Sequence, residues 1–596
     1  MCFPMYAVPL KVLLQMGEMI PHEELKATGR LVEFQNSLGK AMFVSHQWVG
    51  HRHPDPEFKQ LKVLQDALTY VTTELEVIPV DLVTETMMPS AKGLRTAELR
   101  SDPLFIWYDY FSCPQLEYTS QRRDNENRSQ LLNAIASIPA YVNTSSFFLA
   151  LCPVVENPSQ SMLFTPASWA ERGWCRVERA LRELCSDESW IMVKSATNVE
   201  LVLGKEASVG GGPPGEGEFS VAEDRTALAP VMVDALRRKL HMLLQSQDLV
   251  SYRLVLNLQG VYLSGLPAET LHEPVPGFSM NTETDSVSMA VASFLFQNGF
   301  ASVRQRDRAG WSPLHYASLR GDPTLIQGLL DQRADPNCKT RRDQPRVGIP
   351  PLTSAVSICL LYKHNKAARL LIEAGAAVNG SGQIRPPMTC AADANNAEGV
   401  RLLCESGCSP HARNLFGISA FESACACGSM AAMEELLSQS QSGFGGRSFD
   451  MSDALFCAML HRGGTAELVQ WLVSKGANVN KSRSVWKHSV AFGILTTLKS
   501  LQHTYGTASA CTKSLHHVPE ATPLMLAVNT SQYAGAAALV AAGARLDIRN
   551  LRGWSAADFA KGQSMPGFLM QALEGNPTEC LRVSAIASDG YVEVFF

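Results

Sequence analysis

The sequence of 596 residues has no long apolar run. The longest obvious candidate, Phe147 to Val155, contains a proline and falls well short of the roughly 18 residues of a membrane span. The first 20 residues also lack the basic segment, the unbroken apolar stretch and the small-residue cleavage site of a secretory leader. We therefore expect a cytoplasmic protein without a membrane-spanning segment.

An excess of charge of one sign is missing too. The formal net charge is −5, and charged residues make up only 18% of the chain. Such a balance gives no general attraction to nucleic acid or to an anionic membrane, and we predict neither as a partner. The Gly-rich stretch 205–220 lacks the Gly-Lys-Ser/Thr of a phosphate-binding loop. The hydrophobic fraction of 46% is nevertheless ample for a folded core.

Cysteine is abundant, but its pattern fits no disulfide framework. The chain has 15 cysteines, an odd number, which is typical of free thiols in a reducing compartment. Two groups have metal-ligating side chains, namely His46 with His51 and His53, and Cys404 with Cys408 and His411. The first has no second ligand pair in register, and the second falls on positions of the repeat described next. We predict no metal site and no bound cofactor.

The carboxyl-terminal half of the sequence repeats itself. Prolines 313, 351, 387 and 523 occupy the same place in their segments as alanines 420, 454 and 556. Most successive spacings lie between 33 and 38 residues, and one of 69 is about two periods. A period near 33 is typical of stacked helix pairs.

Gly310 to Asn337 reads GWSPLHYASLRGDPTLIQGLLDQRADPN and resembles an ankyrin repeat. Similar units run over 350–379, 385–414, 416–437, 453–480 and 521–550, and a truncated unit opens at Arg552. The resemblance implies an all-α ankyrin solenoid over residues 301–578, with about six to eight repeats and an insertion at 481–520. It also implies a protein partner on the concave face of that solenoid.

The amino-terminal residues 1–204 have a different pattern. Apolar runs at 42–48, 104–111, 146–153 and 190–195 alternate with helical patterns at 57–73, 130–141 and 169–184. Strands of this kind separated by helices predict an α/β domain with a parallel sheet, whose ligands bind at the carboxyl ends of the strands. A Gly/Pro-rich linker at 205–224 and a helical connector at 225–300 would join this domain to the repeats, and 579–596 would form a tail.

Three segments of this domain resemble motifs of the heterokaryon-incompatibility (HET) domain. Phe43 to Trp48 (FVSHQW) resembles its LSHRW strand, and Trp107 to Gln115 (WYDYFSCPQ) resembles its WIDxxCIxQ segment. Arg172 to Glu178 (RGWCRVE) resembles its RGWTxQE helix, with Val177 in place of glutamine. The order of elements is also similar to that of a TIR domain, which implies a flavodoxin-like sheet. In catalytic TIR domains the matching glutamate, here Glu178, cleaves nicotinamide from NAD.

The chemistry of that reaction suggests a role for each candidate residue. Cleavage of the glycosidic nicotinamide bond passes through an oxocarbenium-like state, which a carboxylate such as Glu178 stabilises. The predicted substrate-binding residues around it are Ser45, His46, Trp48, Trp107, Asp109 and Trp174. Other interpretations stay open: Trp174 as a core residue, Glu178 as an ion-pair partner of a nearby arginine, and Asp109 as part of a structural network. A nucleophilic Cys113 or Cys175 with His46 as its base is a further alternative.

Three functions follow from these patterns. The first is an intracellular ankyrin scaffold or adaptor for protein–protein interaction that carries a TIR/HET-like signalling domain. The second is an assembly-dependent NAD nucleosidase that uses Glu178, with NAD as substrate rather than cofactor. The third is a non-catalytic adaptor that self-associates through its amino-terminal domain. The sequence leaves open the partner, the trigger, the oligomeric state and the role of the 481–520 insertion.

Overall fold

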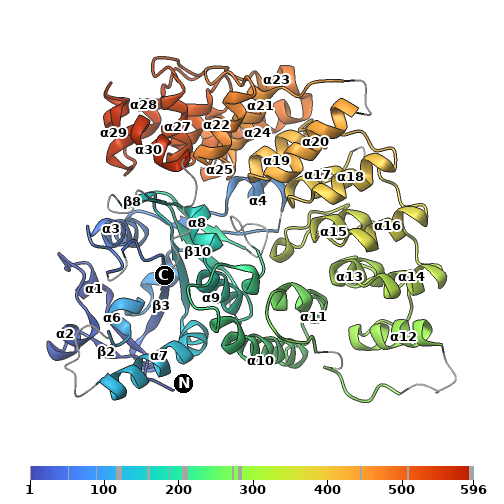
Figure 1. The fold of residues 1–596 in the computed structure, drawn as a ribbon, viewed down its shortest axis with the longest axis horizontal. Coiled ribbons are helices and arrows are strands. Elements are labelled where there is room, and N and C mark those ends of the chain that lie inside the picture. Colours follow the sequence, from blue (N-terminus) through green and yellow to red (C-terminus); the bar gives the residue numbers. More distant parts are fainter. Residues whose placement is uncertain are drawn as a thin grey trace.

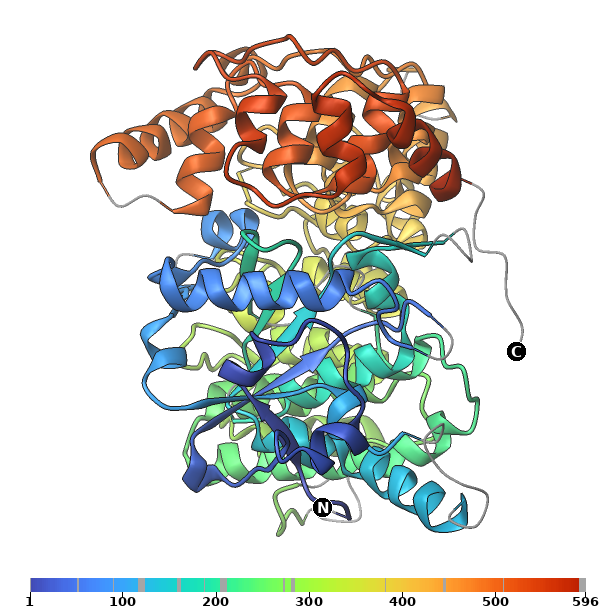
Figure 2. The same ribbon diagram turned by 90° about the vertical axis from the view of Figure 1, so that its left-hand side faces the viewer.

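The computed structural model describes residues 2–588 except 51–52, 89, 116–123, 158–161, 187, 204–211, 272–273, 280–284, 381, 443–445 and 507–508. An α/β domain forms the amino-terminal third, and stacked helix pairs form most of the rest (Figure 1). The helix pairs curve in an arc around the α/β domain, so the two parts lie side by side rather than end to end (Figure 1, Figure 2).

Four parallel strands form the middle of the α/β domain. They are β3 (Lys40–Ser45), β6 (Leu104–Trp107), β7 (Phe147–Leu151) and β10 (Trp190–Val193), and each overlaps one of the four apolar runs predicted as strands. The run at 104–111 is a strand only in its first half, because residues 109–112 form a short helix. Their order across the sheet is β10-β7-β3-β6. The carboxyl ends of all four strands therefore lie along one edge of the sheet.

The edges of the sheet differ from the all-parallel prediction. On one side, β1 (Tyr6–Pro9) runs antiparallel to both β6 and β2 (Val32–Glu33). On the other side, β11 (Val199–Val202) runs antiparallel to β10. The connection from β10 to β11 is a short turn, closed by a 3.0 Å hydrogen bond from the Lys194 amide to the Asn198 carbonyl. Such a short connection joins only antiparallel strands, so the seven-stranded sheet is mixed.

Helices cover both faces of this sheet. Helix α3 (Lys59–Thr73) buries Leu61, Leu64 and Leu68 against one face. Helices α7 (Asp124–Thr144) and α9 (Gly173–Glu183) pack on the other face, around Phe43 and Trp107. Because successive strand residues point to opposite faces, strands covered on both sides are apolar throughout, which explains the runs seen in the sequence.

The segment predicted as a connector joins the two parts. Helix α10 (Asp224–Gln245) shares a hydrophobic core with α9, and α11 (Leu249–Leu263) packs against both α10 and α13 (Pro313–Arg320). Helix α12 (Ser286–Asn298) packs against α14 (Pro323–Asp331). Helices α11 and α12 thus form the first layer of the helix array. Of the predicted linker, residues 212–224 are described, and the Glu218 carbonyl accepts a hydrogen bond from the Gly173 amide at the start of α9.

The array itself consists of antiparallel helix pairs. After α13 and α14 come α15 (Ala355–Leu361), α16 (Asn365–Glu373), α17 (Pro387–Asp393), α18 (Ala397–Glu405), α19 (Ala420–Cys427), α20 (Met430–Ser442), α21 (Met451–Leu460), α22 (Ala466–Ser474), α26 (Pro523–Asn529), α27 (Tyr533–Ala541), α28 (Ala556–Ala560) and α29 (Gly567–Leu573). The first helices of successive pairs pack on one another from α13 to α28. In Figure 1, α13, α15, α17 and α19 form the inner row of the arc, and α14, α16, α18 and α20 form the outer row.

Local sequence explains why these helices begin and end where they do. The Thr522 hydroxyl accepts a hydrogen bond from the Met525 amide, and Pro523 occupies the first helical position. Gly407 and Gly543, which follow α18 and α27, have φ values of 84° and 86° and so adopt the left-handed conformation in which glycine commonly ends a helix.

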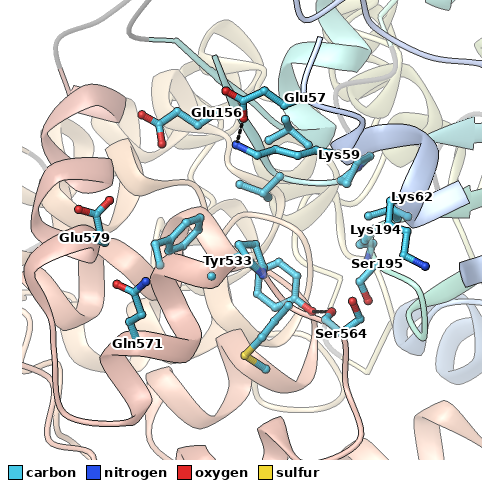
Figure 3. A pocket seen from close by; sticks show the side chains of 18 of the residues that line it. Glu57, Lys59, Lys62, Glu156, Lys194, Ser195, Tyr533, Ser564, Gln571 and Glu579 are labelled. Carbon is cyan, nitrogen blue, oxygen red and sulfur yellow. Dashed lines mark hydrogen bonds and ion pairs between the residues drawn. The ribbon is translucent and has the colours of Figure 1, made fainter. Parts of the chain in front are cut away.

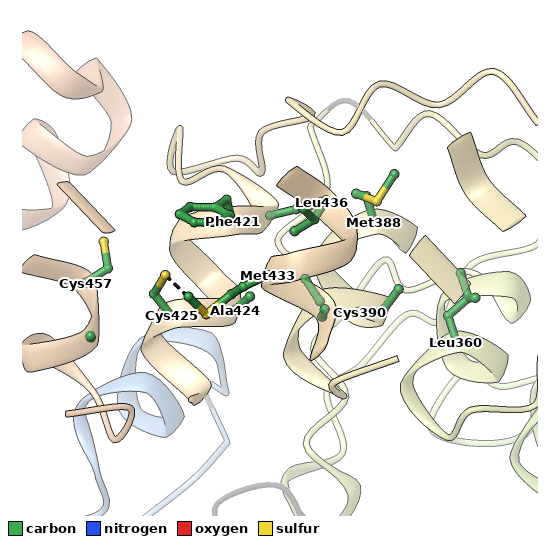
Figure 4. Close-up of a cluster of buried hydrophobic side chains, with 14 of the residues drawn as sticks. Leu360, Met388, Cys390, Phe421, Ala424, Cys425, Met433, Leu436 and Cys457 are labelled. Atoms are coloured by element: carbon green, nitrogen blue, oxygen red, sulfur yellow. Dashed lines mark hydrogen bonds between the residues drawn. The ribbon is translucent and has the colours of Figure 1, made fainter. Parts of the chain in front are cut away.

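One continuous hydrophobic core runs along the array. Figure 4 shows part of it: Phe421 of α19 and Met433 and Leu436 of α20 belong to one helix pair, and Met388 and Cys390 of α17 belong to the preceding pair. The Cys425 thiol lies 3.6 Å from the Met433 sulfur. All 15 cysteines are free thiols, and most of them are buried.

The predicted insertion and tail are both helical where the structure describes them. The insertion contains α23 (Val485–His488), α24 (Val490–Tyr505) and α25 (Ala510–His517), and α25 packs against α4 (Leu82–Met87) of the α/β domain. Residues predicted to open a tail form α30 (Thr578–Ser588) instead, which packs on α27, α22 and α29.

Candidate functional site

The candidate residues from the first two predicted strands meet at the carboxyl edge of the sheet. Phe43 of β3 is in register with Trp107 of β6, so the residues two places further on, Ser45 and Asp109, lie next to each other. Asp109 opens the short helix α6 (Asp109–Ser112). His46 lies in the loop that follows β3.

Asp109 is the centre of a hydrogen-bonded group. Its Oδ1 lies 2.8 Å from Nε2 of His46, and its Oδ2 accepts a 2.7 Å hydrogen bond from the Trp48 indole. The Tyr110 amide donates to Oδ1 over 2.6 Å. On the far side of the imidazole, the Tyr108 hydroxyl lies 3.1 Å from Nδ1, and the two rings stack with centroids 3.9 Å apart. The imidazole orientation is therefore fixed from both sides.

The charges of this pair stabilise each other. Burial opposes the charged form of His46, but the neighbouring Asp109 carboxylate outweighs that effect and raises the pKa of His46. Burial also opposes ionisation of Asp109, yet His46 and the Trp48 indole lower the pKa of this carboxyl below its usual range. The side chain of His46 is only 3% exposed, whereas that of Asp109 is 35% exposed. The carboxylate is the member of the pair that solvent reaches.

Glu178 joins the same group from the other side. It lies on α9, with a hydrogen bond to the Ser45 hydroxyl, and burial raises its pKa to about 8. The nearby Asp109 carboxylate adds to this shift. Ser45 in turn accepts a 3.1 Å hydrogen bond from the Trp169 indole. At neutral pH the site thus contains one protonated carboxyl group, Glu178, beside one carboxylate, Asp109.

Trp107 and Trp174 lie elsewhere. Trp107 is buried in the core, where it stacks on Phe43 with ring centroids 4.2 Å apart. The indole of Trp174 donates a 2.8 Å hydrogen bond to Asp224 at the start of α10. Neither ring therefore belongs to the group around Asp109. The predicted residues that the fold does bring together are Ser45, His46, Trp48, Asp109 and Glu178.

The nearby arginines and cysteines bear on the alternative interpretations. Arg176 donates to the Ala170 carbonyl over 2.6 Å, and Arg179 forms an ion pair with Glu183. Burial raises the pKa of the Cys113 thiol well above its usual range, and it also raises that of Cys175. Protonated thiols are poor nucleophiles, so these surroundings disfavour cysteine catalysis.

One residue that contacts this group was not among the residues predicted from the sequence. Tyr108 contacts His46 through both its hydroxyl and its ring. It stands between two residues that were chosen, Trp107 and Asp109. The available signal was the alternation of a strand: if Trp107 points into one face, Tyr108 points to the other, toward the residues that follow β3.

A separate cavity of about 820 Å³ lies between the α/β domain and the array. Figure 3 shows Glu57 and Lys59 of the α/β domain on one side of it, and Tyr533 and Gln571 of the array on the other. Lys194 and Ser195, which follow β10, also line it. The array therefore covers part of the carboxyl edge at which the sheet would bind a ligand.

Comparison with known proteins identifies the repeats. Residues 309–341 match the family model described as Ankyrin repeat. The chain therefore contains one segment that matches an ankyrin repeat. The crystal structure of the human ASB11 ankyrin repeat domain is 23% identical, with a TM-score of 0.31 and coverage of 44% of this chain and 97% of that one. No curated protein matches the chain.

The matched family residues lie outside residues 1–204, so the HET/TIR resemblance of the ankyrin-repeat protein stays a prediction. The same holds for the catalytic and substrate-binding roles assigned to Glu178 and its neighbours. Among the helices that the structure describes, none has the length and apolar character that crossing a membrane would require.

Proposed function

We propose that this protein is an interaction scaffold whose ankyrin repeats hold its own α/β domain and exchange it for a protein partner. The supporting observation is a buried ion cluster where the two parts meet. The Arg462 guanidinium, in the turn between α21 and α22, lies 3.4 Å from both Asp81 and Glu200 of the α/β domain. Lys194 pairs with Glu200 over 2.7 Å.

Polar contacts continue along the array on either side of this cluster. The side-chain amide of Asn198 donates to the Ser531 hydroxyl over 2.8 Å, and the Ser90 hydroxyl donates to Asp343 over 2.7 Å. The last helix, α30, adds an ion pair between Arg582 and Glu156. An interface that spans several repeats is typical of the way stacked repeats bind a folded protein.

The predicted partner on the concave face would therefore compete with the α/β domain. Helices α13, α15, α17 and α19 lie on the side of the array that is turned toward that domain (Figure 1). A partner that needs this surface must displace the domain. Weakening the internal contact should then strengthen partner binding, because less free energy is spent on release.

A quantitative pull-down with the full-length protein tests this proposal. We expect Arg462→Met to capture more of the same partner than the wild type. Arg401→Met is the matched control, because the exposed Arg401 side chain pairs with Glu435 between α18 and α20, away from the α/β domain. Equal capture by the wild type and Arg462→Met would refute the competition, and no specific capture by either would refute the scaffold.

A second candidate function is cleavage of an N-glycosidic bond such as that of NAD. It is favoured by the opposite pKa shifts of Asp109, which is lowered, and Glu178, which is raised. An ionised Asp109 would stabilise an oxocarbenium-like cation, and a protonated Glu178 would donate a hydrogen bond to a ribose hydroxyl. His46 would hold Asp109 in place. This assignment moves the carboxylate role from Glu178 to Asp109.

Incubation of concentrated full-length protein with NAD tests the second candidate through release of nicotinamide. We expect release by the wild type and by Glu74→Gln, an exposed control in the same domain, but not by Glu178→Ala, which removes the hydrogen-bond donor. Release should also decline as the pH rises through about 8, where Glu178 loses its proton. Absence of nicotinamide at every protein concentration would exclude this activity, and a rate that rises through pH 8 would restore Glu178 as the carboxylate.

A further inference from the structure

The insertion exposes an apolar stripe along α24. Val490, Ile494, Leu498, Leu501 and Tyr505 are between 49% and 84% exposed. At 100° per residue these five positions fall within a narrow arc of the helix. Trp486 of α23, 53% exposed, extends the stripe at one end. A contiguous apolar surface of this kind is typical of an interaction site.

The spacing of the stripe is that of a helix-pairing seam. Ile494, Leu498, Leu501 and Tyr505 are separated by four, three and four residues, which is the a/d pattern by which two helices interlock. The flanking positions of such a seam normally carry the charges that select a partner. Here they are Leu495, Thr497, Gln502 and Thr504, and none of them is charged.

The opposite face of α24 holds the helix firmly in place. Lys499 forms a 2.9 Å ion pair with Glu85 on α4, and Nδ1 of His503 lies 3.4 Å from the Thr512 hydroxyl on α25. Phe492 and Thr496 are buried. Lys499 and His503 of α24 thus contact neighbouring helices, while the outward face is uncharged at neutral pH and fixed in orientation. In Figure 2 the insertion helices project from the body of the molecule.

We infer that the α24 seam is a dimer interface, in which it packs against the same seam of a second copy of this chain about a two-fold axis. In such an interface every residue near the axis meets its own counterpart, so any charge on the seam would meet a like charge. An uncharged seam with uncharged flanks meets this requirement. It also lacks the flanking charges that would direct it to a different helix.

The exposed area sets the expected strength. At about 200 Å² for a fully exposed aromatic side chain, the six residues offer on the order of 600 Å² per copy. A standard interface buries roughly 800 Å² per partner, so the pair falls slightly short of that size. We expect a dissociation constant on the order of 10 µM.

Sedimentation velocity of the full-length protein from about 1 to about 100 µM tests the inference. The wild type should shift from monomer to dimer over this range, and Leu498→Glu should weaken the dimer at least tenfold because two carboxylates would then meet across the axis. Leu132→Glu on α7 is the matched control: Leu132 is 58% exposed and Leu498 is 60% exposed. It should dimerise like the wild type.

Three outcomes would overturn the inference. They are a wild type that stays monomeric at every concentration, a Leu498→Glu variant that dimerises like Leu132→Glu, and loss of the dimer in Leu132→Glu as well. If the seam binds only a different protein, the wild type stays monomeric, which is the first of these outcomes. Because Leu498 is exposed, its variant should keep the wild-type thermal midpoint, and Leu501→Glu provides a second variant if it does not.

Discussion

Removal of the Arg462 charge tests how the array holds the α/β domain. Arg462, Asp81 and Glu200 have side chains that are 6%, 5% and 17% exposed. Removing one partner of a buried ion pair costs about 3–5 kcal/mol, because the remaining charge stays buried without compensation. Asp81 retains the Thr84 hydroxyl, and Glu200 retains Lys194. We therefore expect a cost at the low end, about 3 kcal/mol, for Arg462→Met.

Hydrogen exchange measures this cost where it acts. In a chain with two coupled parts a single free energy of unfolding is poorly defined, so the exchange of amides in α4 and β11 is the better measure. A loss of about 3 kcal/mol should speed their exchange roughly 100-fold if these amides exchange through opening of the interface. Exchange within twofold of the wild type would refute the assignment, and Arg401→Met should leave it unchanged.

The pH dependence follows from the sign of the Asp81 shift. Burial alone would raise the pKa of Asp81, but Arg462 outweighs it and the pKa lies below its usual value near 3.8. A carboxyl group with a lowered folded-state pKa stabilises the fold fully above its unfolded pKa, and the effect is lost as the pH falls through the folded value. In the wild type the exchange of the α4 amides, corrected for the intrinsic rate, should therefore be the same at pH 5 and pH 7 and should speed up only below about pH 4.

Three further substitutions test the site and the packing. Asp109→Asn should lower the pKa of His46 below 6.5, because burial would remain without the carboxylate; an unchanged value in an NMR titration would contradict the pairing. Gly463→Ala should lower the thermal midpoint and cost about 2 kcal/mol of stability, because its new methyl group would clash with the Cys425 carbonyl. Gly567→Ala is the control: its methyl group would meet no atom within 4 Å, so the thermal midpoint should not change. Phe421→Ala should cost about 3–5 kcal/mol in denaturant unfolding, and a cost below about 1 kcal/mol would mean that the layer around it repacks.

Much of the candidate site could be predicted because it depends on strand register. Ser45, His46, Trp48 and Asp109 lie near the ends of two apolar runs, and parallel strands bring such ends to one edge. Glu178 required more, because its position depends on how α9 packs across the sheet. The sequence offered Trp174 as its neighbour on the same helix face, but that indole is turned toward Asp224.

The edge strands and the arrangement of the two parts could not be predicted. Strand β11 is only four residues long, and its alternation is too short to separate from a loop. The placement of the α/β domain inside the arc depends on pairs such as Arg462 with Asp81, which are 381 residues apart in sequence. Nothing in the local pattern of either segment identifies the other, because each is an ordinary polar turn or helix cap.

Helix α4 connects these observations. Asp81 caps its amino terminus and contacts Arg462 of the array, and Glu85, one turn later, contacts Lys499 of the insertion. The array and the proposed dimer helix α24 therefore both contact the α/β domain through α4, a helix of six residues. A displacement of α4 that breaks one ion pair must disturb the other, since both carboxylates lie on a single turn of helix. If α24 pairs with a second copy, dimer formation should strengthen the contact between the array and the α/β domain. Hydrogen exchange of the α4 amides should then become slower as the protein concentration rises in the wild type. It should not depend on concentration in Leu498→Glu.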